Sequence, residues 1–160
     1  MSTPLDYLYV YLVSLMPFLE GRYALAVATI LDLNPYLSLI MSSLGVLTLS
    51  LLLPTLVEHI DDFITSKVSQ RKGYIACTVG PLYFRYIERL SKKREAISRL
   101  GTMGIAVFVA APFPGTGIWG GSLLAFMLRL SKRRSMLALL VGGLTSNIIV
   151  FTSISIIKNM

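Results

Sequence analysis

The sequence predicts an all-α integral membrane protein with an inverted repeat, in which each half is a re-entrant helical hairpin followed by one transmembrane helix. Hydrophobic residues make up 54% of the 160 residues and charged residues only 14%, whereas an ordinary soluble domain has about 25% charged residues. Two uninterrupted apolar runs, residues 36–57 and 135–157, are long enough to cross a bilayer. Two further apolar segments are each broken near the middle. We expect one membrane domain over residues 1–160.

The clearer break lies at residues 111–117, Ala-Pro-Phe-Pro-Gly-Thr-Gly, inside the apolar segment 100–127. Proline lacks an N–H donor and glycine favours turns, so a helix cannot continue through this stretch. Each arm would be about 18 Å long, little more than half of a hydrocarbon core of about 30 Å. Non-helical backbone at membrane depth must be buried in protein or line a wet cavity. We therefore expect a re-entrant hairpin that enters and leaves by the same face.

The first half has the same layout. Residues 5–31 are apolar but interrupted around Pro17, and a polar turn at residues 32–35 precedes the run 36–57. Placing Pro17 on Pro112 aligns the two breaks, and Pro17, Pro112 and Pro114 are expected at the hairpin tips. The chain then divides into a first repeat (1–57), a basic linker (58–100) and a second repeat (101–160).

A basic amphipathic helix is expected in the linker. Pro81 suits the first turn of a helix, and apolar residues recur behind it at helical spacing: Tyr83, Tyr86, Ile87, Leu90 and Ile97. Such a helix can lie on the cytoplasmic lipid surface, where anionic headgroups attract its cations. Alternatively, its apolar face can pack on the transmembrane bundle.

The basic residues orient the chain. All except Arg22 and Lys158 lie between residues 67 and 134. If both broken segments are re-entrant, these residues share one face of the membrane, and the positive-inside rule makes that face cytoplasmic. Residues 58–100 and 131–134 are then inside, and residues 32–35 and both ends are outside. The halves are inverted, as in many secondary transporters. We expect a multi-pass protein of the plasma membrane, and the net charge of +7 then needs no nucleic-acid partner.

Two segments carry a family resemblance. Residues 104–121, which include Pro-Phe-Pro-Gly-Thr-Gly-Ile-Trp, and the earlier Pro17-Phe-Leu-Glu-Gly-Arg resemble the two signature segments of the small multidrug export family. That family is similar in plan to the DedA-like (VTT/SNARE-associated) superfamily. Its first motif usually reads Glu-x-Arg-Gly-Ala-x-Pro, whereas Tyr23 and Ala26 replace the glycine and the second proline here. The resemblance implies paired re-entrant hairpins and transport, and in some DedA-like proteins proton-linked translocation of polyprenyl-phosphate lipids.

Glu20 and Arg22 are the only ionisable residues expected deep in the membrane. An unpaired charge there costs several kcal/mol, so each must have compensation. One reading is structural, with the two residues paired to each other or to hairpin backbone. The functional reading is that Arg22 receives an anionic group bidentately while Glu20 takes up and releases a proton.

The second break offers a candidate substrate site. Free N–H groups at the helix start near Ile118 form an anion-friendly nest at Gly115, Thr116 and Gly117, although glycines can also serve close packing. Trp119 could flank the substrate or fill space. Asn147, on the last span, is expected to face inward for interhelical hydrogen bonding or to line the pathway.

The first functional hypothesis is a proton-coupled secondary transporter or lipid flippase for a lipid-phosphate carrier or another amphipathic substrate, including the export of amphipathic cations. A membrane-embedded phosphatase of lipid pyrophosphates and a non-catalytic scaffold are the alternatives. No hydrolase constellation or nucleotide-binding loop is visible. One cysteine and one histidine predict no metal site, and no cofactor is expected. Membrane lipids, protons and a second copy in a homodimer are the expected partners.

Overall fold

Helices account for all regular secondary structure in the part of the chain that the computed structural model describes, which is residues 3–17, 19–69, 80–98, 100–113 and 115–158. The seven helices are α1 (Pro4–Leu15), α2 (Glu20–Ile30), α3 (Pro35–Ser69), α4 (Gly80–Ser98), α5 (Gly101–Ala110), α6 (Ile118–Met127) and α7 (Lys132–Lys158). The all-α prediction is confirmed. Several predicted features lie outside the described residues: the cations at 71, 72 and 99, the thiol of Cys77 and the tip residue Pro114.

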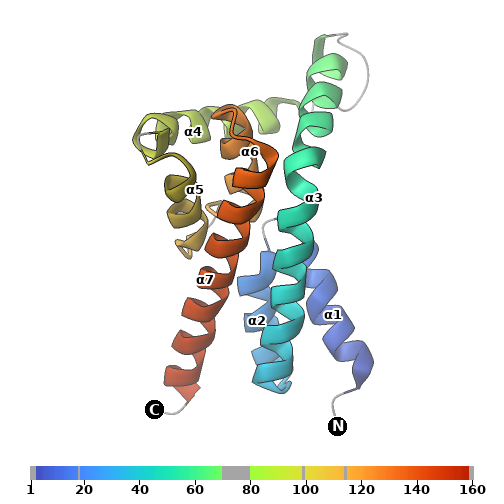
Figure 1. Cartoon of the computed structure of the whole chain (residues 1–160). Helices are drawn as coiled ribbons and strands as arrows, with labels where there is room; N and C mark the ends of the chain where they lie inside the picture. The colour runs from blue at the N-terminus through green and yellow to red at the C-terminus, as the bar shows by residue number, and fades with distance from the viewer. Residues whose placement is uncertain (1–2, 18, 70–79, 99, 114, 159–160) are drawn as a thin grey trace.

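The helices α3 and α7 form the long axis of the molecule (Figure 1). They contain the predicted runs 36–57 and 135–157, and by length and composition each can cross a membrane. Asn34 begins α3 by accepting hydrogen bonds from the N–H groups of Tyr36 and Leu37, at 3.0 and 3.3 Å. Pro54 lies inside α3 and does not end it. The predicted turn and span are therefore both present.

The two short helical pairs lie beside opposite halves of the long helices. Figure 1 shows α1 and α2 beside the end of α3 nearer the chain termini, and α5 and α6 toward the other end of the molecule. α1 ends at Leu15 and α5 at Ala110, and the residue after each, Met16 or Ala111, has extended backbone directly before a proline. This is the conformation that a following proline imposes. The predicted breaks therefore occur where Pro17 and Pro112 stand.

The second helix of each pair ends in the same hydrogen-bonded cap. The N–H of Leu33 donates to the carbonyl of Ala28 at 3.0 Å, and the N–H of Leu130 donates to that of Ala125 at 3.1 Å. The residues before these leucines, Asp32 and Arg129, have φ angles of +50° and +54°. Both helix ends are thus Schellman motifs, in which one left-handed residue turns the chain into the next long helix.

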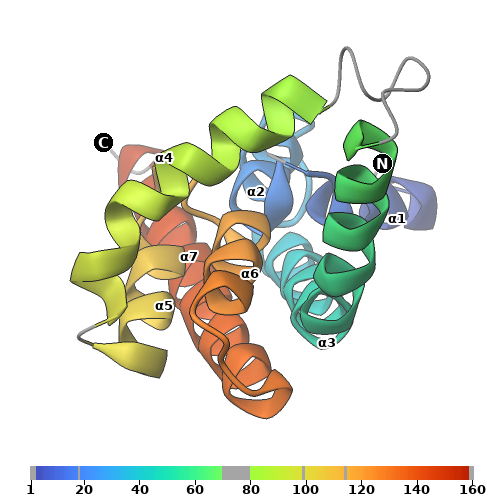
Figure 2. The same cartoon turned by 90° about the horizontal axis from the view of Figure 1, so that it is seen from above.

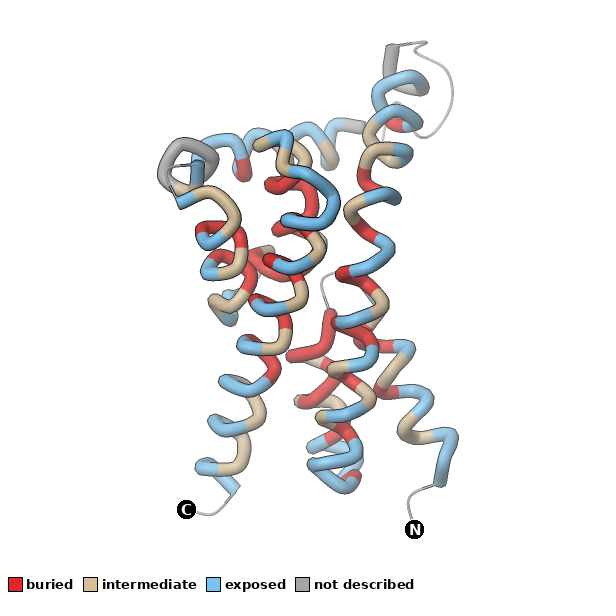
Figure 3. Tube along the Cα trace, viewed as in Figure 1, coloured by how far each residue is buried: buried red, intermediate tan, exposed pale blue. Residues whose placement is uncertain are grey.

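Small residues let the short helices approach the long ones. A side chain at Gly45 of α3 would overlap Ser14 of α1, and a Cβ at Gly142 of α7 would lie 2.5 Å from the carbonyl oxygen of Ala106 in α5. The larger of the two apolar cores lies where α3, α5, α6 and α7 meet, and buried stretches of the chain lie inside the bundle in Figure 3. Packing is therefore sufficient to explain Gly142.

The helix α4 lies across the end of the bundle opposite the termini (Figures 1 and 2). Leu90 is buried in the main core, and Tyr83, Tyr86, Ile87 and Ile97 pack against it. On this helix the basic side chains of Arg85, Arg89 and Lys92 are exposed. The sequence left open whether this helix lies on the lipid surface or packs on the bundle, and the structure shows that its apolar face packs on the bundle. Contact of its basic face with lipid stays a prediction.

We expect Gly142→Leu to lower the free energy of unfolding by about 1–3 kcal/mol, because overpacking against a backbone carbonyl cannot be relieved by a side-chain rotation. Val141→Leu is the matched control, because Val141 is 56% exposed on the same helix. Thermal unfolding in detergent measures both, and equal melting temperatures for the two variants would contradict the packing role.

Candidate functional site

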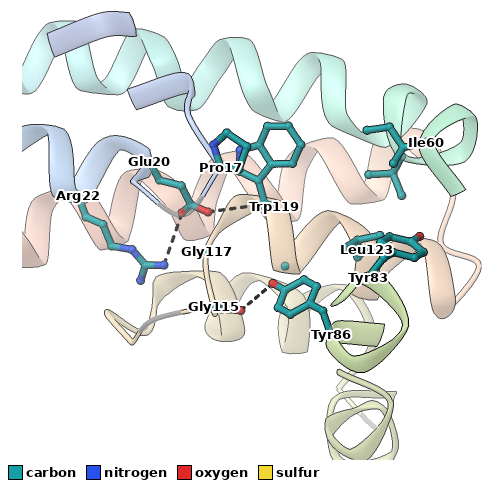
Figure 4. Close-up of a pocket in the computed structure, with 12 residues that line it drawn as sticks. Pro17, Glu20, Arg22, Ile60, Tyr83, Tyr86, Gly115, Gly117, Trp119 and Leu123 are labelled. Carbon is teal, nitrogen blue, oxygen red and sulfur yellow. Dashed lines mark hydrogen bonds and ion pairs between the residues drawn. The ribbon is translucent and has the colours of Figure 1, made fainter. Parts of the chain in front are cut away.

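The two helix breaks meet at Glu20 and Arg22, which lie at the start of α2 and face the start of α6 (Figure 4). Both side chains are buried, with 6% and 5% of their surface exposed. An Nη2 atom of Arg22 lies 3.5 Å from Oε2 of Glu20. The ion pair expected from the sequence is therefore present, although its separation is long for a bidentate contact.

The carboxylate of Glu20 caps the N-terminus of α6. Its Oε2 accepts a hydrogen bond from the N–H of Ile118 at 3.0 Å, and its Oε1 accepts one from the N–H of Trp119 at 3.3 Å. The first N–H groups of a helix have no partner within the helix, and the helix dipole favours a negative charge there. The start of α6 thus binds an anion that the chain itself supplies, through the N–H groups of Ile118 and Trp119. Binding of a substrate anion at Gly115, Thr116 and Gly117 stays a prediction.

Gly117 makes room for this carboxylate. A Cβ at position 117 would overlap the carboxylate group of Glu20. Gly115 has a φ of +81°, a left-handed conformation that side chains disfavour. The two glycines thus serve different purposes: Gly115 turns the chain, and Gly117 leaves space for Glu20.

Arg22 and Thr116 satisfy the free carbonyl groups of the second break. Nη1 of Arg22 donates to the carbonyl of Ala111 at 2.8 Å. The hydroxyl of Thr116 lies 2.6 Å from the same oxygen and 2.8 Å from the carbonyl of Phe113, so one hydroxyl proton is shared between the two. Pairing to backbone, the other compensation expected for Arg22, is therefore also present.

Tyr23 stands where the resembled motif has glycine. Its ring centroid lies 5.6 Å from the guanidinium carbon of Arg22, within the range of a cation–π contact. The substitution therefore adds a favourable contact to the cation at the first break.

Asn147 lies deeper in the bundle. It is 1% exposed, and its Nδ2 donates to the hydroxyl of Ser42 at 2.7 Å, which donates in turn to the carbonyl of Gly21 at 2.8 Å. This chain of bonds ties α7 to α3 and α2. Asn147 faces inward as expected, and it lines only a cavity of about 10 Å³ behind Glu20 and Arg22.

A larger cavity, of about 350 Å³, opens on the other side of the ion pair. Five of the predicted site residues line it together with the tip residue Pro17: Glu20, Arg22, Gly115, Gly117 and Trp119. Thr116 and Asn147 are buried outside it, and Pro112 is exposed. A volume of this size lies within the range of small-molecule sites.

Sequence reasoning missed the contribution of α4 to this cavity. Tyr83 and Tyr86 line it (Figure 4). The hydroxyl of Tyr86 donates to the carbonyl of Gly115 at 3.2 Å, and that of Tyr83 donates to Oδ1 of Asp61 at 2.7 Å. The available signal was their spacing of three residues, which puts both rings on one helix face.

This arrangement is suited to binding and exchange. One carboxylate and one guanidinium meet the donor end of a helix beneath aromatic and apolar walls. Within the described ranges no three His, Cys, Asp or Glu side chains gather closely enough to hold a metal ion. The site therefore offers a place for one small charged group and an attached apolar body.

Comparison with curated proteins and with solved structures found no match to this chain. A family model described as "putative small multi-drug export protein" matches residues 20–149. The match begins at Glu20, directly after the first break, and covers the second break, all of α3 and most of α7. It agrees with the two long apolar helices, which can cross a membrane. The chain therefore belongs to the small multi-drug export protein family.

Proposed function

We propose that this membrane protein is a proton-coupled secondary transporter of amphipathic molecules that carry an anionic head group, of which polyprenyl-phosphate lipids are the representative class. The observation that carries the proposal is the placement of Glu20. Its carboxylate occupies the N–H groups of Ile118 and Trp119 at one edge of the cavity. A substrate phosphate or carboxylate would seek the same donors.

The charge state of Glu20 decides whether those donors are available. When Glu20 is ionised, it neutralises Arg22 and caps α6, so the site is closed to another anion. When Glu20 is protonated, it loses its advantage as a cap, and Arg22 and the helix N-terminus are left with net positive charge. The indole N–H of Trp119 and Nε of Arg22, which have no partner among the described residues, are further donors. An anion and a proton are therefore bound together and released together.

The cavity walls suit the apolar part of such a substrate. Beyond the ion pair the lining is aliphatic and aromatic, with Val57, Ile60 and Leu123 beside the tyrosine rings. Apolar surface removed from water contributes roughly 25 cal/mol per Å². The head group thus supplies orientation, and the attached chain supplies affinity.

We further propose the inverted, re-entrant topology for the membrane-embedded protein. Its supports are the two breaks before proline, the matching caps of α2 and α6 and the placement of both described chain ends at one end of the bundle (Figure 1). In this arrangement the end that carries α4 is cytoplasmic. The homodimer and the plasma membrane stay predictions, and light scattering of the detergent-solubilised protein tests the first.

Export of amphipathic cations is the second candidate, and the family description favours it. Three aromatic residues, Tyr83, Tyr86 and Trp119, line the cavity beside Glu20, and aromatic faces attract cations. A cation would compete with a proton for Glu20, so the two would move in opposite directions. Arg22 argues against this candidate, because it already neutralises the carboxylate and repels a second cation.

The direction of coupling separates the two candidates. In liposomes containing the purified protein, an acidic exterior should drive uptake of a fluorescent short-chain polyprenyl phosphate, and Glu20→Gln should reduce this uptake to the level of empty liposomes, because glutamine cannot release a proton. Glu58→Gln is the control, because Glu58 is half-exposed and pairs with Lys132 outside this cavity. Uptake of ethidium driven by an acidic interior, and lost in Glu20→Gln, would instead establish the cation exporter.

Arg22→Lys tests the anion site directly. Lysine keeps the charge but loses the planar fork, and each charge-assisted hydrogen bond contributes about 1.5–3 kcal/mol. We expect binding of the polyprenyl phosphate to weaken about 10- to 100-fold, measured by its fluorescence anisotropy. Arg85→Lys, on the exposed face of α4, should leave binding unchanged. Wild-type affinity in Arg22→Lys would reduce Arg22 to a counter-ion of Glu20.

Cysteine labelling tests the topology. With Cys77 replaced by serine, a cysteine at Ser131 should react with a membrane-permeant maleimide and resist an impermeant one in intact cells. A cysteine at Asn34 should react with both reagents. Reaction of the Ser131→Cys variant with the impermeant reagent from outside would rule out the re-entrant topology.

A further inference from the structure

The two ends of α4 are held to the bundle in different ways. Toward its C-terminal end, Leu90 is 3% exposed in the main core, and the carbonyl of Ile97 lies so close to Gly104 of α5 that a Cβ there would be 2.6 Å away. At its N-terminal end, Pro81, Leu82, Phe84 and Arg85 are all exposed. Backbone packing thus fixes one end, and the other end lies over the cavity.

Two tyrosine hydroxyls fasten the N-terminal half of α4 across the cavity. Tyr83 donates to a carboxylate oxygen of Asp61 on α3 at 2.7 Å, and Tyr86 donates to the carbonyl of Gly115 at the second break at 3.2 Å. The two acceptors belong to α3 and to the second break, which are far apart in the sequence. Residues of both segments line the cavity. Each bond therefore joins α4 to a different edge of the cavity. Figure 4 shows the bond of Tyr86 to Gly115.

Both phenols remain donors at physiological pH. Burial, and then the hydrogen bond and charge of Asp61, raise the pKa of Tyr83 well above its usual value of 10. Burial, and then the charge of Glu20, raise the pKa of Tyr86 to about 12. Neither bond is therefore lost by ionisation of the phenol.

We propose that residues 80–87 of α4 are the gate of the cavity and that the hydroxyls of Tyr83 and Tyr86 are its two latches. The gate opens by swinging the N-terminal half of α4 away from α3 and from the second break, while Leu90 and Ile97 stay packed. Opening exposes the cavity wall at Leu123 and gives a substrate access to Glu20. Both tyrosine rings line the cavity, so the residues that close it also contact what it holds.

Thiol labelling measures this opening without any substrate or pH gradient, so its result is independent of the proposed transport. Cys77 is replaced by serine, and Leu123, an 8% exposed residue of the cavity wall, by cysteine. While the gate is closed, we expect this cysteine to react slowly with N-ethylmaleimide in detergent. A net hydrogen bond of about 0.5–1.5 kcal/mol predicts that Tyr83→Phe and Tyr86→Phe each accelerate labelling about 3- to 10-fold, and that the double variant multiplies the two effects.

Three controls make the test specific. Tyr11→Phe also removes a hydroxyl contact, at 3.2 Å to Thr48, but lies on α1 and should not accelerate labelling at position 123. Asp61→Leu should match Tyr83→Phe, and combining these two should add nothing, because they break the same bond. A second reporter, Ala28→Cys, is 2% exposed in the separate core of α1 and α2 and should keep its slow rate in every variant.

The proposal fails if the double tyrosine variant labels at position 123 as slowly as its parent, because the hydroxyls then restrain nothing. It also fails if the variants accelerate labelling at positions 28 and 123 equally, since that result means global destabilisation. Acceleration confined to position 123, shared by Asp61→Leu and absent in Tyr11→Phe, establishes the gate.

Discussion

The hydrogen bonds from the start of α6 to the carboxylate of Glu20 are the interaction on which the rest of the structure depends. A helix that begins inside a membrane leaves unpaired N–H groups, and a buried carboxylate without a partner costs several kcal/mol. Each break therefore needs the other. The first break supplies a carboxylate and the guanidinium of Arg22, and the second supplies N–H groups and the carbonyl of Ala111. Neither short helical pair can be buried alone without leaving the other's polar groups unpaired.

The sequence predicted the parts of the fold that local chemistry determines. Pro17 and Pro112 each follow the end of a helix, because proline removes an N–H donor and forces the residue before it into extended backbone. The two long apolar runs can only be helices at that hydropathy and length. The apolar spacing in α4 predicted its helix but not its neighbour, because one apolar face fits lipid and protein equally well. Its packing depends on Leu90 meeting a core assembled from α5 and α6, which no local pattern encodes.

The sequence identified most of the residues of the candidate site but not the groups that they contact. Glu20, Arg22 and the glycines of the second break stood out because charge and glycine are rare in apolar segments. The nearest cation in the sequence suggested an ion pair, yet the shorter contacts of Glu20 run to backbone almost one hundred residues away. The sequence predicted that the start of α6 would bind the anion of a substrate. In the structure its N–H groups donate to Glu20, and sequence cannot reveal that the chain itself supplies an anion there. Tyr83 and Tyr86 were read as packing residues, since their hydroxyl partners lie on other elements.

The backbone at Glu20 shows how the two breaks divide their roles. Counting back from the matching caps of α2 and α6, Glu20 stands where Gly117 stands in the second half. Glu20 has a φ of +50°, a left-handed conformation that costs a residue with a side chain roughly 1–2 kcal/mol. Glycine would relieve that strain, but it would remove the carboxylate that caps α6. At position 117 the same carboxylate fills the space that a side chain would need. The first break therefore carries the charged group under strain, and the second leaves the space that receives it. The caps of α2 and α6 are alike in the two halves of the chain, but these two aligned positions must hold different residue types. The hydrogen bonds of the Glu20 carboxylate help to hold this strained backbone. In the proposed exchange, protonation weakens those bonds, and relief of the strain then favours release of Glu20 from α6.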